Sequence, residues 1–153
     1  FQDSDDAGVL FAETARGAGI NIEVVRKPND GYWSNTWLKD SWVASYWGGR
    51  PTEDWMFSQV YSKNAIDTGW SETFFNNPRF EELLPQARAE LDDAKRREMY
   101  VEMQRVVHDN CSVIIPIFSA YGHASSDKVK RPENIASNWE FDGNKNAERW
   151  WFG

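Results

Sequence analysis

A short stretch around residue 50 combines residue types that could hold a small molecule. Trp47 is followed directly by Gly48, Gly49 and Arg50. Glycines let the backbone approach a ligand closely, an indole offers a flat stacking face, and a guanidinium can grip a carboxylate or phosphate through two hydrogen bonds. A tight turn in which Arg50 is solvated or paired with a nearby carboxylate explains the same residues, so both interpretations stay open.

Two acidic pairs are the other candidates for chemistry. Glu81-Glu82 and Asp92-Asp93 each fall at the first turn of an expected helix, where the helix dipole favours negative charge. A capping role therefore explains them better than general acid catalysis. The sequence also contains no phosphate loop, no dinucleotide fingerprint and no nucleophile elbow. We therefore expect no catalytic residues and no enzymatic activity.

Metal-ligating residues are sparse. His108 and His123 are the two histidines, and no pattern of cysteines or carboxylates surrounds them. Cys111 is the single cysteine, so no internal disulfide can form, and its position beside an apolar run predicts a buried thiol. The sequence thus predicts neither a metal site nor a cofactor.

The elements that would position these residues alternate between helix and strand patterns. Three segments have the alternation or apolar content of strands: 20–24, 42–47 and 112–121, the last interrupted by Pro116. Helix patterns are expected at 7–16, 31–39, 51–61, a segment that opens at Asn77-Pro78 and is kinked or restarted at Pro85, and 92–109. This order predicts an α/β fold, a mixed sheet covered by helices, with Arg50 just beyond the carboxyl end of a strand, where ligands of such sheets bind.

Composition restricts the class of protein. The 153 residues suffice for one domain, and the net charge of −7 without a basic stripe argues against nucleic-acid binding. Aromatic residues make up 15% of the chain and include nine Trp, an excess that serves either a core or a stacking surface. No apolar run is long enough to cross a bilayer. The chain opens on Phe1 without a Met, which fits processing or a piece of a longer protein.

Three segments resemble one known family. They are ETARGAGINIEVVRKPNDGYWSNTW at 13–37, ASYWGGRPTEDWMFSQVY at 44–61, and NPRFEELLPQARAELDDAKRREMYVEMQRVVHDNCSVIIPIF at 77–118. Together they make the chain, over roughly residues 7–120, similar to the C-terminal part of the extracytoplasmic solute-binding proteins of ABC importers, those of the peptide and opine type. The third segment is the most specific, because its helix caps, apolar stripe and Pro116 agree in register.

The resemblance implies a fragment of a longer receptor. Residues 1–121 would form part of one α/β lobe of a two-lobe periplasmic-binding-protein-like fold, and residues 122–153 a tail that returns toward a missing first lobe. It also implies export to the periplasm or another extracytoplasmic compartment. The implied partners are a small-molecule ligand and the permease subunits in the membrane.

The resemblance gives the loop at residue 50 a role in choosing the ligand. Peptide-binding members carry an Asp three residues after the Trp that matches Trp47, and that Asp pairs with the free amine of the peptide. Arg50 occupies this position here, while Phe57 keeps the register of the loop. An anionic, opine-like or phosphorylated ligand is therefore implied rather than a free-amine peptide. The candidate ligand-binding residues are Tyr32, Trp33, Tyr46, Trp47, Gly48, Gly49 and Arg50.

Two alternatives remain beside the importer receptor. The aromatic excess also fits a stand-alone carbohydrate- or small-ligand-binding module without a transport role. The acidic pairs alone motivate a hydrolase with an unrecognised site.

Overall fold

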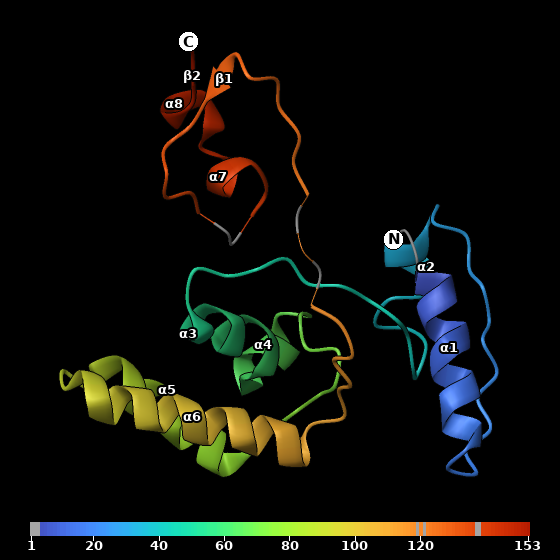
Figure 1. Ribbon diagram of the computed structural model, residues 1–153. Coiled ribbons are helices and arrows are strands. Elements are labelled where there is room, and N and C mark those ends of the chain that lie inside the picture. The colour runs from blue at the N-terminus through green and yellow to red at the C-terminus, as the bar shows by residue number, and fades with distance from the viewer. Residues whose placement is uncertain (1–3, 119, 121, 137–138) are drawn as a thin grey trace. The chain divides into compact units, whose positions relative to one another are not determined.

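The chain forms two compact units, residues 1–47 and 48–153. The computed structural model describes residues 4–118, 120, 122–136 and 139–153 (Figure 1). Helices make up 48% of the structure and strands 3%. The predicted α/β fold with a mixed sheet covered by helices is therefore wrong. The predicted division after residue 121 stays a prediction.

The first unit contains two helices joined by extended chain. Helix α1, Ser4–Arg16, begins with Asp5 and Asp6 in its first turn, as the helix dipole favours, and confirms the expected helix at 7–16. Helix α2, Tyr32–Asn35, follows Gly31, whose φ of 72° lies in the left-handed region that favours glycine. A Cβ atom at this position would also lie 2.7 Å from the side-chain nitrogen of Asn35.

The second unit begins with three short helical segments. Helix α3, Glu53–Met56, starts at Thr52, whose hydroxyl accepts a hydrogen bond from the backbone N–H of Trp55. It continues as a π-helical turn, Phe57–Tyr61, and is followed by α4, Lys63–Asp67. The expected helix over 51–61 is thus present in two parts, whereas α4 lies in a stretch without a clear helix pattern.

Two long helices follow and pack side by side (Figure 1). Helix α5, Pro78–Ala89, is capped by Asn77, and helix α6, Asp93–Asn110, is capped by Asp92. The helix does not restart at Pro85, because α5 continues through it, and the predicted kink there stays a prediction. A proline inside a helix costs about 3 kcal/mol, and the burial of the neighbouring Leu84 and Ala87 offsets this cost.

The hydrophobic core of the second unit lies between these elements. Phe80, Ala87 and Met103 are completely inaccessible to solvent. Edge-on aromatic contacts join Phe80 to Phe57 and Phe75, with ring centroids 5.3 and 5.4 Å apart. The full buried cluster consists of Phe57, Phe75, Phe80, Leu83, Leu84, Ala87, Tyr100, Met103 and Val107. The buried residues of the two long helices recur at the spacing of the helical repeat, so one face of each helix packs into this core.

The C-terminal residues of the second unit are held by a buried carboxylate. Strands β1, Val129–Lys130, and β2, Trp151–Phe152, pair in antiparallel fashion, and α7, Glu140–Asn144, and α8, Asn146–Arg149, lie between them in sequence. Asp142 within α7 has a φ of 63°, a left-handed conformation that costs a non-glycine residue about 1–2 kcal/mol. Its carboxylate accepts hydrogen bonds from the Ala136 N–H at 2.6 Å, Arg149 at 2.9 Å and the Trp150 indole at 3.3 Å. These bonds hold the turn.

The three predicted strands are extended segments without ladder partners among the described residues. Neither helix nor strand is present at residues 20–28, 43–50 and 111–118. Strand β1 pairs with β2 alone. Residues 119 and 121 of the third predicted strand lie outside the described part. Alternating apolar residues favour an extended backbone, but a strand also needs a neighbour to exchange hydrogen bonds with. The apolar side chains consequently stay exposed, as Trp42 at 63% and Ile117 at 61% show.

Candidate functional site

The seven candidate ligand-binding residues fall in both units. Tyr32, Trp33, Tyr46 and Trp47 belong to the first unit, while Gly48, Gly49 and Arg50 belong to the second. The two groups are therefore two candidate regions, each with its own geometry.

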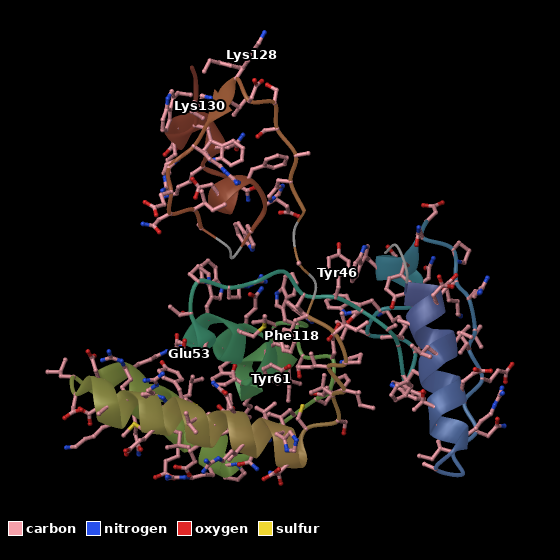
Figure 2. All side chains as sticks on the ribbon, viewed as in Figure 1. Tyr46, Glu53, Tyr61, Phe118, Lys128 and Lys130 are labelled. Atoms are coloured by element: carbon pink, nitrogen blue, oxygen red, sulfur yellow. The ribbon has the colours of Figure 1, made fainter. Side chains whose placement is uncertain are left out.

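An aromatic cluster forms the candidate region of the first unit. Trp33 is at its centre, with ring centroids 5.3 Å from Tyr32, 5.6 Å from Trp37 and 5.7 Å from Tyr46, all in edge-to-face geometry. Helix α2 supplies Tyr32 and Trp33, and the extended segment before the unit boundary supplies Tyr46, which is labelled in Figure 2. The structure thus brings three of the predicted residues together. Trp47, which follows Tyr46 directly in the sequence, is half-buried.

The cluster presents aromatic faces to solvent. Trp33 is 49% and Tyr46 is 56% exposed, and the Tyr32 hydroxyl donates a hydrogen bond to the Ala44 carbonyl that ties α2 to the extended segment. Exposed aromatic rings held in a fixed arrangement can stack on a planar or sugar-like ligand. Trp37 was missed as a member of this cluster. Its spacing of four residues from Trp33, the repeat of one helical turn, is the signal that could have revealed it.

Arg50 forms the centre of the second candidate region. Its Nε donates to Gln59 Oε1 at 2.9 Å, and its Nη1 donates to the carbonyl oxygens of Gly48 at 2.9 Å and Gly49 at 3.3 Å. The guanidinium carbon lies 6.0 Å from the centroid of the Trp55 ring, within cation–π range. Arg50 therefore folds the double-glycine loop back on itself and attaches it to the π-helical turn.

The indole of Trp139 also touches this loop. Its Nε1 donates to the Gly49 carbonyl at 2.7 Å. The Gly49 oxygen thus accepts from Arg50 and from an indole of the same unit. Backbone carbonyls with two lone pairs accept two such bonds readily.

A charged network centred on Asp54 was not predicted from the sequence. Asp54 Oδ1 accepts hydrogen bonds from Arg88 Nε at 2.7 Å and from the Tyr100 hydroxyl at 3.2 Å, and Arg88 Nη2 also donates to the Ser58 hydroxyl. Burial raises the pKa of Tyr100 to about 12, with the Asp54 charge adding to the effect. Partners that are 34 and 46 residues apart carry no local sequence signal, so this network depends on the tertiary fold.

The acidic pairs have structural partners. Asp92 caps α6 by accepting the N–H groups of Ala94 and Lys95, which confirms its predicted capping role. Glu81 accepts the backbone N–H of Lys63 at 2.7 Å. Glu82 and Asp93 form ion pairs with arginines three residues away on their own helices.

The histidine and cysteine side chains that could bind a metal have separate partners. His108 contacts the neighbouring Asp109, and His123 Nε2 accepts the Phe141 N–H at 3.2 Å. Cys111 is half-buried against the core rather than fully buried as predicted, and burial raises the pKa of its thiol. Within the described residues, no three His, Cys, Asp or Glu side chains gather as a metal site would require.

None of the helices in the described part of the chain is both long and apolar enough to cross a membrane. No protein-family model, no curated protein and no solved structure matches the chain.

Proposed function

We propose that the chain belongs to the solute-binding receptor of an ABC importer and captures a small peptide-like or opine-like molecule with an anionic group. The observation that carries this proposal is the aromatic cluster, in which the ring centroids of Tyr32 and Tyr46 lie 5.3 and 5.7 Å from that of Trp33. The resemblance implies an aromatic wall near Tyr32 or Trp33 and a backbone contact from Tyr46. The proposal concerns the ligand and the role and not the fold, because the described residues do not form the expected α/β lobe.

The residues of the loop supply the second line of support. Arg50 occupies the position of the amine-binding Asp in the resemblance, and its positive charge disfavours an ammonium group there. Its present hydrogen bonds to Gln59 and two glycine carbonyls keep the guanidinium half-buried. A carboxylate is a stronger acceptor than these neutral groups, so an anionic ligand could replace one of them.

In this role the protein makes and breaks no bonds. Binding shifts the receptor toward the conformation that the membrane permease recognises. The proposal therefore includes an extracytoplasmic location and permease subunits as partners.

Calorimetric titration of the chain tests the proposal with an opine, a free-amine tripeptide and a neutral oligosaccharide. The opine is expected to bind more tightly than the tripeptide. Trp33→Ala tests the aromatic cluster of the first unit by removing its central ring, and Arg50→Asp tests the loop of the second unit separately by reversing its charge; at least one of the two substitutions is expected to weaken opine binding. Arg97→Asp, an equal charge change at an exposed residue of α6, is the control. Opine binding that survives both Trp33→Ala and Arg50→Asp would exclude these residues as contacts.

A stand-alone carbohydrate-binding module is the second candidate, favoured by the exposed Trp33 and Tyr46 rings. Sugar rings stack on such faces without a charged partner. This candidate predicts that the neutral oligosaccharide binds, that Trp33→Ala abolishes its binding, and that Arg50→Asp leaves it unchanged. The same titrations therefore separate the two functions.

A further inference from the structure

A surface cavity of about 420 Å³ lies in the second unit, and none of the seven candidate ligand-binding residues lines it. Its volume is within the range of small-molecule sites, about 300–1,000 Å³. Glu53, labelled in Figure 2, belongs to its α3 side, and α5 and α6 supply the opposite residues. The lining consists of Thr52, Glu53, Asp54, Arg88, Arg96 and Tyr100.

The two arginines of the cavity are held in place yet keep donors for a ligand. Arg88 uses its Nε for Asp54 and its Nη2 for Ser58, while Arg96 uses its Nη1 for the Glu90 carbonyl at 2.9 Å and its Nη2 for Asp93. A guanidinium has five N–H groups. Each arginine therefore retains three N–H donors without a partner among the described residues, on a side chain that is already ordered.

The acidic residues of the cavity differ in how they are engaged. Asp54 forms an ion pair with Arg88 at 2.7 Å and accepts a hydrogen bond from the Tyr100 hydroxyl. Glu53 is exposed, and its carboxylate has no ion-pair partner among the described residues. The cavity thus combines unused guanidinium donors with an uncompensated carboxylate at its edge.

We propose that this cavity binds a small zwitterion, with a carboxylate or phosphate held by Arg88 and Arg96 and an amine facing Glu53. A purely anionic ligand would satisfy the arginines but be repelled by Glu53, and the chain as a whole carries a net charge of −7. A zwitterion satisfies both ends. The site does not depend on the importer role.

Matched ligand pairs test the amine requirement. The arginine Nε–H resonances of the full chain are followed by NMR during titration with 4-aminobutyrate and butyrate, and with phosphoethanolamine and ethyl phosphate. Within each pair the two ligands differ mainly by the amine. At least one amine-bearing ligand is expected to bind saturably, shifting the Arg88 and Arg96 signals, and about tenfold more tightly than its partner, as a charge-assisted contact implies. The two pairs also decide between carboxylate and phosphate.

Variants identify the residues. Arg96→Gln is expected to weaken binding about tenfold or more, while Arg97→Gln, the same charge change on the neighbouring exposed residue, leaves it within about twofold. Glu53→Gln should lower the affinity of the amine-bearing ligand to that of its partner. Equal losses in the Arg96 and Arg97 variants, equal affinities within both pairs, or the absence of saturable binding would each overturn the proposal. Arg96 is chosen because Arg88 also holds Asp54, so that its loss could disturb the fold.

Discussion

Asp54 and Arg88 form an ion pair of 2.7 Å that links the short helix α3 to the long helix α5. The carboxylate of Asp54 is 28% exposed, so the pair is only partly screened by water. The Arg88 pKa is raised, chiefly by its hydrogen bond to Asp54. This contact joins α3 to the helix pair, and both of its residues line the cavity.

A double-mutant cycle measures this link. The cycle of Asp54→Ala and Arg88→Ala is expected to show an interaction free energy of about 0.5–1.5 kcal/mol, because the pair is charge-assisted but partly solvated. Urea unfolding followed by Trp fluorescence provides the free energies. A parallel cycle of Asp54→Ala with Arg97→Ala should give a value near zero. A similar coupling in both cycles would mean that long-range charge, and not the contact, is responsible.

The cap of helix α5 makes a second prediction. The side chain of Asn77 accepts the backbone N–H groups of Arg79 at 3.0 Å and Phe80 at 3.2 Å. Asn77→Ala should lower the free energy of unfolding by about 1 kcal/mol, since the first turn loses its side-chain acceptor. Asn76→Ala, at the exposed residue before it, should change stability little. Equal effects of the two substitutions would contradict the capping role.

The core of the second unit is tested at Phe80, which is completely buried. Phe80→Ala should destabilise the unit by about 3–5 kcal/mol, because it removes a ring that contacts Phe57 and Phe75 and leaves a cavity. Phe118→Ala removes the same ring from a residue that is 90% exposed, and we expect a change within about 0.5 kcal/mol. Thermal denaturation by circular dichroism distinguishes the two variants.

The buried carboxylate of Asp142 makes a fourth prediction. Asp142→Asn should destabilise the C-terminal residues by about 1–3 kcal/mol, because the Arg149 guanidinium loses its charged partner and one indole or backbone bond is weakened. The near-ultraviolet circular dichroism of the tryptophans should change as well, since Trp150 donates to this carboxylate. Asp127→Asn, at an exposed residue, serves as the control. An unchanged spectrum in Asp142→Asn would rule out the network as the anchor of the left-handed turn.

Two tyrosines should make the fold sensitive to alkaline pH. The pKa values of Tyr61 and Tyr100 are both raised from 10.0 to about 12, chiefly by burial. Between pH 10 and 12 the unfolded chain has released these protons while the folded chain keeps them, so stability should fall as the pH rises through this range. Below pH 10 both states hold the protons, and the two groups add no pH dependence.

The titration of tyrosinate absorbance checks this assignment. Tyr61→Phe and Tyr100→Phe should each remove part of the ionisation near pH 12 and reduce the alkaline loss of stability. If neither substitution alters the high-pH part of the titration curve, the raised pKa values belong to other groups.

Local signals in the sequence were sufficient for the starts of the two long helices, but not for the short helices α4, α7 and α8. Asn77-Pro78 and Asp92 start the two long helices because a side-chain acceptor satisfies N–H groups within three residues. The apolar faces around Phe80 and Met103 follow from the helical repeat. The alternation of apolar and polar residues could not predict whether a sheet forms. A strand makes its hydrogen bonds to a distant segment, and the alternating pattern does not specify that segment.

The sequence by itself therefore determined where the long helices begin and which of their faces are buried. Only the tertiary structure decided that residues 20–28, 43–50 and 111–118 stay unpaired among the described residues. It also decided that Arg50 binds Gln59 and that Asp54 meets Arg88 and Tyr100. The physical reason is range, since caps and helical faces depend on neighbours within one or two turns, whereas ion pairs and sheets join residues tens of positions apart.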